Sequence, residues 1–217
     1  MYLEYIFTVF NIVFLSIRND QMLQAEYIIL TGLIVLLTFV VAYFAYQGSA
    51  IDSTDPIVYK YRTLRRQGRE SDIDPTMFPY KCGICNSYVG SKTKHCGSCN
   101  KCVSEFDHHC DWLNNCIGQS NFNNFMMLVL TYAIHTALIL AITVLNLVND
   151  TGISNVYLVI LITVYIIKLI IITNLLIQNV YFMYLGIGTY DYILEQRENS
   201  ELKRKLNNKE ITKEQYH

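Results

Sequence analysis

Three long apolar blocks constrain the fold of this chain more than any other feature, and they cover residues 27–47, 125–148 and 156–178. The first two contain no Asp, Glu, Lys or Arg, and the third contains only Lys168. At a rise of ~1.5 Å per residue, a helix of about 20 residues crosses the ~30 Å hydrocarbon core of a bilayer. Each block is therefore predicted to be a transmembrane helix.

A shorter apolar stretch lies at the start of the chain. Residues 1–17 contain one charged residue, Glu4, and are at the short end for a span. A signal peptide is not expected, because the stretch has no basic leading segment and no small-residue cleavage motif before Arg18. A helix lying in the membrane interface, or native sequence upstream of Met1, stays open as an alternative. We predict a short first span, and therefore four transmembrane helices.

The segments between and after the blocks carry most of the charge. Residues 48–124 contain nine Lys and Arg, and the tail, residues 179–217, contains six. Because cytosolic segments carry an excess of Lys and Arg, we expect both of these segments and the N-terminus on the cytosolic side. The net charge of −1 gives no indication of a nucleic-acid partner. The predicted fold class is an all-α polytopic membrane protein with a small cytosolic domain between helices 2 and 3.

All seven cysteines lie between residues 82 and 116, within the core of this loop at residues 80–124. Pairs of cysteines separated by two residues, with histidines between the pairs, are typical of zinc sites rather than of disulfides. The loop has few apolar runs and cannot build a large hydrophobic core. Metal coordination would supply the folding free energy that packing cannot.

The number of ligands fits two zinc ions. A structural zinc ion takes four nitrogen or sulfur ligands. With Cys110 set aside, six cysteines, His95 and either His108 or His109 make eight ligands, which is two Cys3His sites. One cysteine and one histidine then remain outside the metal sites.

Asp107, His108 and Cys110 are the three residue types of an activated nucleophile. Cysteine reacts as the thiolate, a histidine takes its proton, and a carboxylate orients the histidine. Cys110 also lies 15 residues before the block that begins at residue 125, which would place the thiol near the membrane surface. From spacing alone, catalysis and a purely structural metal module stay equally open.

The motifs of the loop resemble a known family. The stretch from Cys82 to Phe125 contains CGIC, KTKHCGSCNKC, FDHHCDW and NNCIGQSN. Together they resemble the cysteine-rich domain of the DHHC protein S-acyltransferases, or palmitoyltransferases. Four membrane helices with this domain between the second and third are also the architecture of that family. The resemblance implies transfer of a long-chain acyl group from acyl-CoA, such as palmitoyl-CoA, to cysteines of membrane-associated proteins.

The resemblance also implies roles for individual residues. Cys110 would form an acyl-enzyme thioester, with His108 as general base and Asp107 orienting it, while Thr189 would support Asp107. Two structural zinc ions would have separate ligand sets, which are Cys82, Cys85, His95 and Cys102 for one ion and Cys96, Cys99, His109 and Cys116 for the other. The acyl chain would lie in a cavity between the membrane helices, for which the candidate lining residues are Trp112, Phe125 and His135.

Three motifs depart from the family pattern. Asp111 stands where the family usually has proline, and its charge is expected to disfavour the Cys110 thiolate. The family motif Thr-Thr-x-Glu corresponds to Gly188-Thr189-Tyr190-Asp191, and Asp-Pro-Gly corresponds to Asp55-Pro56-Ile57. These departures support an alternative function, a catalytically weak or inactive zinc-binding membrane scaffold.

Polar residues inside the predicted spans usually face a protein interior or a cavity. His135 is expected either to line the acyl cavity or to form a hydrogen bond between helices. A helix carbonyl or His135 is a conceivable partner for Lys168. Threonines in the spans are expected to bond between helices.

The expected setting follows from the family and the charge pattern. The protein is expected in an endomembrane of the ER or Golgi, with both termini and the cysteine-rich domain in the cytosol. Its expected partners are acyl-CoA, membrane-associated proteins with cytosolic cysteines and the lipid bilayer, without nucleic acid.

Overall fold

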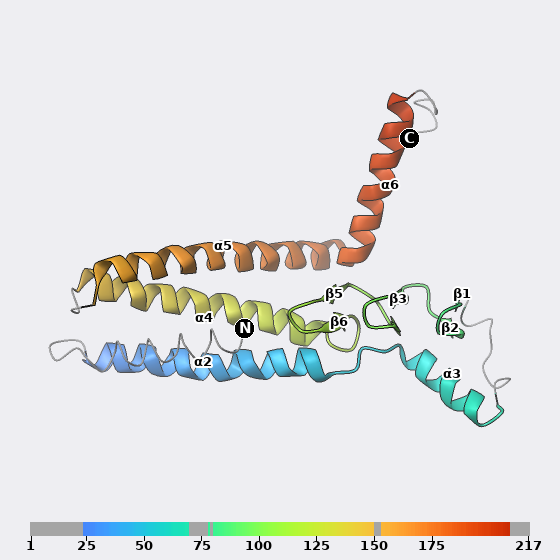
Figure 1. Cartoon of the computed structure of the whole chain (residues 1–217), viewed down its shortest axis with the longest axis horizontal. Helices are drawn as coiled ribbons and strands as arrows, with labels where there is room; N and C mark the ends of the chain where they lie inside the picture. Colours follow the sequence, from blue (N-terminus) through green and yellow to red (C-terminus); the bar gives the residue numbers. More distant parts are fainter. Residues whose placement is uncertain (1–23, 70–77, 79, 150–152, 209–217) are drawn as a thin grey trace. The chain divides into compact units, whose positions relative to one another are not determined.

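The computed structural model describes residues 24–69, 78, 80–149 and 153–208 (Figure 1). The described chain is mostly helical and forms two compact units. One unit comprises the described parts of residues 1–51 and 121–178, and the other comprises those of residues 52–120 and 179–217. The predicted first span at residues 1–17 lies outside the described residues.

Three helices in the described part of the chain are long and apolar enough to cross a membrane. They are α2 (Gln24–Ala50), α4 (Phe122–Val148) and α5 (Asn155–Leu185). Three of the predicted spans are therefore confirmed as apolar helices. Each helix extends beyond the predicted block, because the flanking residues, polar at the ends of α2 and mostly apolar at the end of α5, also adopt helical backbone.

The first unit is held together by apolar contacts between these helices. Helices α2 and α4 lie side by side (Figure 1), and a buried cluster joins Tyr27 and Ile34 of α2 to Ile139 and Ile142 of α4 and Tyr165 of α5. Large apolar side chains elsewhere on α2 and α5 stay exposed, as expected for surfaces that face lipid rather than water.

The hydroxyl groups in the spans bond mostly within their own helix, so the prediction that the threonines bond between helices was wrong for four of them. Each of the four hydroxyls donates to the carbonyl four residues earlier at 2.7–2.9 Å, in Thr131, Thr136, Thr143 and Thr163. That carbonyl is always within reach, whatever the neighbouring helix offers.

A side-chain hydrogen bond near the middle of the helices joins α2 to α4. The Oγ1 atom of Thr38 lies 3.0 Å from Nε2 of the buried His135, and Thr38 donates its hydroxyl proton to the Ile34 carbonyl at 2.8 Å. Since Thr38 has a single proton to donate, His135 donates from Nε2 to Thr38. On α5, Lys168 Nζ lies 5.8 Å from the centre of the Tyr165 ring, in a cation–π contact.

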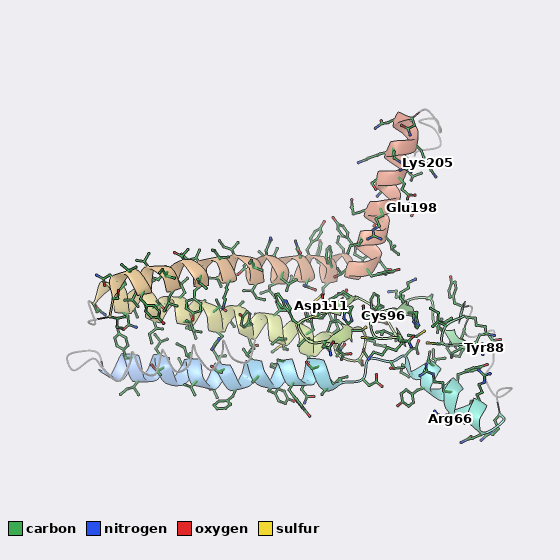
Figure 2. All side chains as sticks on the ribbon, in the orientation of Figure 1. Arg66, Tyr88, Cys96, Asp111, Glu198 and Lys205 are labelled. Carbon is green, nitrogen blue, oxygen red and sulfur yellow. The ribbon has the colours of Figure 1, made fainter. Side chains whose placement is uncertain are left out.

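Two helices flank the cysteine-rich region of the second unit. Helix α3 (Pro56–Arg66) begins after Asp55, whose Oδ1 accepts the Ile57 N–H at 2.8 Å, with proline at the first helical position. Asp55 Oδ2 also accepts the Thr93 hydroxyl at 2.6 Å, which joins the start of α3 to the hairpins. Helix α6 (Thr189–Asn207) has no fully buried side chain, and Figure 2 labels Glu198 and Lys205 on it.

The cysteine-rich region consists of three antiparallel two-stranded hairpins, which the all-α prediction missed. They pair β1 (Tyr80–Cys82) with β2 (Ser87–Val89), β3 (Lys94–Cys96) with β4 (Lys101–Val103), and β5 (His108–Cys110) with β6 (Asn115–Ile117). Strands of three residues are too short to show an alternating hydrophobic pattern. Each four-residue turn ends in an asparagine with φ between 46° and 48°, namely Asn86, Asn100 and Asn114. Asparagine adopts this left-handed conformation more readily than most residues.

Candidate active site and metal centres

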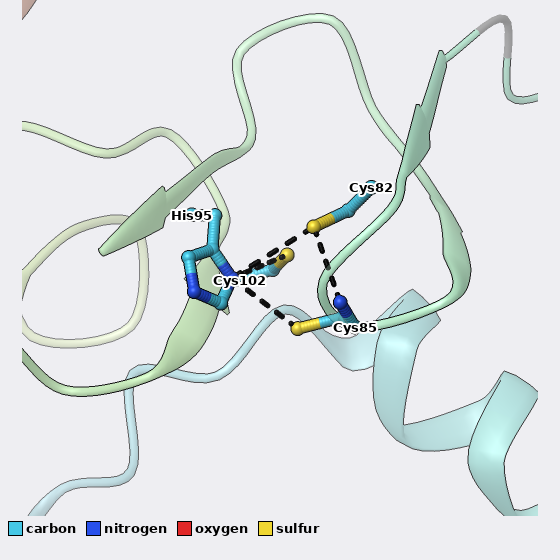
Figure 3. A group of neighbouring side chains, drawn as sticks. All are labelled: Cys82, Cys85, His95 and Cys102. Atoms are coloured by element: carbon cyan, nitrogen blue, oxygen red, sulfur yellow. Dashed lines mark hydrogen bonds between the residues drawn. The ribbon is translucent and has the colours of Figure 1, made fainter. Parts of the chain in front are cut away.

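The first group of metal-ligating side chains comes from the first two hairpins (Figure 3). His95 Nδ1 lies 3.8 Å from Cys82 Sγ, 3.4 Å from Cys85 Sγ and 3.8 Å from Cys102 Sγ. With Zn–S bonds of ~2.3 Å and Zn–N bonds of ~2.0 Å, tetrahedral geometry puts sulfur and nitrogen about 3.5 Å apart. This group therefore fits a zinc ion.

The second group comes from the second and third hairpins. His109 Nδ1 lies 3.9 Å from Cys96 Sγ, 3.4 Å from Cys99 Sγ and 3.7 Å from Cys116 Sγ. In each group the four ligand atoms all lie within 4.8 Å of one another. The two groups contain the eight residues predicted as ligands and are consistent with two zinc ions.

Sulfur atoms this close together need a cation if all are to be thiolates. Burial and the neighbouring Cys85 and Cys82 sulfurs raise the pKa of Cys102 above its ordinary value. Burial and the neighbouring Cys99 and Cys96 sulfurs likewise raise the pKa of Cys116 above its ordinary value. A bound zinc ion would offset this repulsion, and would join neighbouring hairpins that have few apolar contacts.

The three residues predicted to be catalytic lie together at the start of the third hairpin. His108 Nδ1 lies 2.7 Å from Asp107 Oδ2, and the His108 side chain also hydrogen bonds with Cys110. Because His108 Nδ1 is hydrogen bonded to Asp107, the ring nitrogen that is left to form the hydrogen bond with Cys110 is Nε2. Successive side chains of a strand point to opposite faces, so His108 and Cys110 share one face of β5 while His109 reaches the metal group from the other.

The electrostatics of this group favour a charged histidine beside a thiolate. Burial alone would lower the pKa of His108, but Asp107 and Cys110 outweigh it and raise this pKa to about 9. Burial alone would raise the pKa of Cys110, but His108 and the backbone N–H groups of Leu113 and Trp112 bring it below its ordinary value. At neutral pH these directions favour an imidazolium–thiolate pair.

Asp107 also forms the N-terminal cap of helix α6. The Thr189 backbone N–H donates to Asp107 Oδ1 at 2.7 Å, while the preceding residue, Gly188, offers no capping side chain. Burial would raise the pKa of Asp107, but hydrogen bonds from His108 and Thr189 outweigh it and lower this pKa. The positive end of the helix dipole also favours the carboxylate. Thr189 therefore contacts the residue that it was predicted to support.

Aromatic contacts hold the start of α6 against the hairpins. The rings of Tyr190 and Phe106 meet edge to face with centroids 5.4 Å apart, and Lys94 Nζ lies 5.7 Å from the Tyr190 ring centre. Sequence reasoning missed this contact, since nothing local relates Tyr190 to residues more than 80 positions earlier. It keeps the Thr189 N–H close to Asp107 where the family's first threonine is absent.

Asp111, the residue at the usual proline position, contacts a metal ligand. Its Oδ1 lies 3.4 Å from Nε2 of His109, and its side chain is 93% exposed. A carboxylate on the second nitrogen of a ligating histidine holds the ring in the tautomer that binds metal. The predicted effect of Asp111 on the Cys110 thiolate stays a prediction.

The residues proposed to line an acyl cavity differ in burial. Trp112 is 67% exposed, whereas Phe125 and His135 of α4 are 4% and 1% exposed. Their role with the acyl chain stays a prediction. Arg62 of α3, which sequence reasoning did not connect with the metal sites, has Nη2 3.7 Å from Cys85 Sγ.

The described part of the chain thus combines a Cys110–His108–Asp107 group, two Cys3His groups and three helices long and apolar enough to cross a membrane, a combination suited to thiol-based group transfer at a membrane. Residues 76–196, more than half of the chain, match the family model described as DHHC palmitoyltransferase. The chain belongs to this family, and is therefore a protein S-acyltransferase that uses acyl-CoA. No curated protein matches the chain.

Proposed function

We propose that Cys110 is the nucleophile of this acyltransferase and carries the acyl group between acyl-CoA and the protein substrate. The observation that carries the proposal is the hydrogen-bonded series from Asp107 through His108 to Cys110, with 2.7 Å between Asp107 Oδ2 and His108 Nδ1. Asp107 orients the imidazole and stabilises its cation, as in other nucleophile–histidine–carboxylate groups.

In the first step, the Cys110 thiolate attacks the thioester carbonyl of a long-chain acyl-CoA. The carbon–sulfur bond to CoA breaks, and the His108 imidazolium gives its proton to the departing CoA thiolate. The products are free CoA, a Cys110 thioester and neutral His108.

In the second step, neutral His108 acts as the general base for a cysteine thiol of the protein substrate. The substrate thiolate attacks the Cys110 thioester, and Cys110 leaves as a thiolate beside the regenerated imidazolium. Protons and charge balance over the cycle, and the enzyme returns to its starting state.

The zinc ions take no part in these steps. Bound zinc would keep its cysteine ligands ionised and join adjacent hairpins, so that β5 presents His108 and Cys110 in a fixed geometry. His109 would be a zinc ligand, whereas His108 transfers protons in the reaction.

The setting of the reaction follows from the charge pattern and the family. The enzyme works in an endomembrane of the ER or Golgi, with its cysteine-rich domain and both termini in the cytosol. Its substrates are membrane-associated proteins with cytosolic cysteines. Trp112, Phe125 and His135 line the path of the acyl chain, and a short first span at residues 1–17 completes four membrane helices.

The test is incubation of the purified full-length protein with labelled palmitoyl-CoA, beside Cys110→Ser. Label on the wild type alone, released by neutral hydroxylamine, is the expected result for a cysteine thioester. A folded wild type that retains two zinc ions and takes no label would instead support the scaffold function, which the departures at Asp111 and Gly188 favour.

A further inference from the structure

The three hairpins repeat one construction. The first strand of each hairpin ends in a cysteine, and these cysteines follow at intervals of 14 residues: Cys82, Cys96 and Cys110. A four-residue turn follows each cysteine and ends in the left-handed asparagine described above. Cys110 therefore occupies the same place in its hairpin as two metal ligands occupy in theirs.

In each of the three turns, a backbone N–H lies near the sulfur atom of the cysteine three residues earlier. The N–H of Cys85, three residues after Cys82, donates to Cys82 Sγ at 3.4 Å. The N–H of Cys99 is likewise close enough to Cys96 Sγ to interact with it, and the N–H of Leu113 interacts with Cys110 Sγ while donating to the Cys110 carbonyl oxygen at 3.2 Å. The third turn thus keeps the backbone frame of a zinc knuckle, meaning a C-x2-C turn whose two sulfurs bind one ion.

What differs is the side chain three residues after the cysteine. In the first two turns it is a ligand, Cys85 or Cys99, and in the third it is Leu113, which is 4% exposed. The first two knuckles are each completed by a cross-strand pair of the next hairpin, His95 with Cys102 and His109 with Cys116. Among the described residues, α4 rather than a fourth hairpin follows the third hairpin.

We propose that the hairpin carrying Cys110 is a third zinc knuckle in which Leu113 replaces the second ligand and keeps the nucleophile free of metal. An alkyl side chain offers no electron pair to zinc, so Cys110 and His108 lack the third ligand that a stable site needs. A thiolate bound to zinc shares its electron pair with the ion and would be a weaker nucleophile toward the acyl-CoA thioester. This inference rests on the proposed role of Cys110 as nucleophile.

The test restores the missing ligand with Leu113→Cys in the full-length protein, beside Leu113→Ser. Serine has nearly the volume of cysteine and creates the same loss of packing, but it is a poor zinc ligand. Zinc per chain is measured by elemental analysis, and acyl-enzyme formation from labelled palmitoyl-CoA is measured over a range of free Zn²⁺ concentrations. Leu113→His provides a second ligand type at the same place if the cysteine variant does not retain its two structural ions.

With the cysteine variant we expect a third zinc ion per chain, at Zn²⁺ concentrations that leave the serine variant with two. We also expect the Zn²⁺ concentration that halves acylation to fall by about tenfold or more, because a third ligand is added to Cys110 and His108. Chelator should restore acylation. Equal zinc content and equal Zn²⁺ sensitivity in both variants would overturn the proposal. The metal count does not depend on acylation, so failure of Cys110 as nucleophile would be recognised separately.

Discussion

The most informative perturbation is Asp107→Asn, which removes the negative charge beside His108 at nearly constant size. The pKa of His108 rises to about 9 from an ordinary value of 6.5, with Asp107 the strongest of the groups that raise it. At 1.36 kcal/mol per pKa unit, this rise corresponds to about 3 kcal/mol in favour of the imidazolium. The substitution also leaves one oxygen where two now accept from Thr189 N–H and His108 Nδ1.

Acyl-enzyme formation by Asp107→Asn at pH 7.5 should therefore fall by about tenfold, because nearly all imidazoles with a pKa of about 9 but only about one tenth of those with a pKa of about 6.5 are charged at that pH. The ratio of the two rates should grow toward roughly 300-fold above pH 9, where the whole shift is expressed. The sign of the pH dependence follows from the raised pKa. The imidazolium of the wild type persists up to about pH 9, so the rate of acylation should fall as the pH rises through that value. In the variant the fall should begin near the ordinary histidine pKa of about 6.5.

The assay is the single-turnover rate of labelling with palmitoyl-CoA in detergent, from pH 6 to 10, with zinc content measured on the same samples. Asp52→Asn is the matched control, because Asp52 is an exposed carboxylate of the same unit that accepts hydrogen bonds from Thr54 and Lys101. Its rate should stay within about twofold of wild type, since exposed ion pairs contribute little. An Asp107→Asn variant with two zinc ions and a wild-type rate and pH profile would refute the reasoning.

Three further changes test other parts of the structure. Cys82→Ala should release one zinc ion and destabilise the first two hairpins, which elemental analysis and limited proteolysis would detect; retention of both ions would contradict the ligand set. Gly118→Ala would put a Cβ atom 2.5 Å from Val103 Cγ1, so we expect a loss of about 2 kcal/mol or more and weaker zinc retention. Thr38→Val removes the hydrogen-bond acceptor for His135 and should lower the free energy of unfolding in detergent by about 1 kcal/mol. The measurement is the Tm, which should fall. An unchanged Tm would show that this bond does not stabilise the helix pair.

Much of the candidate site was predictable because metal ligation depends on residue type and short spacing. The C-x2-C pairs and the interleaved histidines identify the ligand types without any knowledge of the fold. Counting ligands left open whether His108 or His109 binds metal. The choice depends on the two faces of β5, where His109 points to one side and His108 and Cys110 to the other.

The repeat of 14 residues was a signal in the sequence that the ligand count did not use. It relates Cys110 to Cys82 and Cys96. It also gives Leu113 the position in its turn that the metal ligands Cys85 and Cys99 have in theirs. The hairpins themselves were not predicted, since three-residue strands carry no periodic pattern and their turns depend on asparagine in a left-handed conformation.

The sequence by itself determined the apolar spans and the chemistry of the cysteine-rich loop, because run length, ligand type and short spacing are local properties of a chain. Only the tertiary structure decided which groups meet across long separations. Thr189 reaches Asp107 across 82 residues, and Thr38 reaches His135 across 97. Such contacts have no local signature, since they exist only after packing and metal coordination have brought distant segments together.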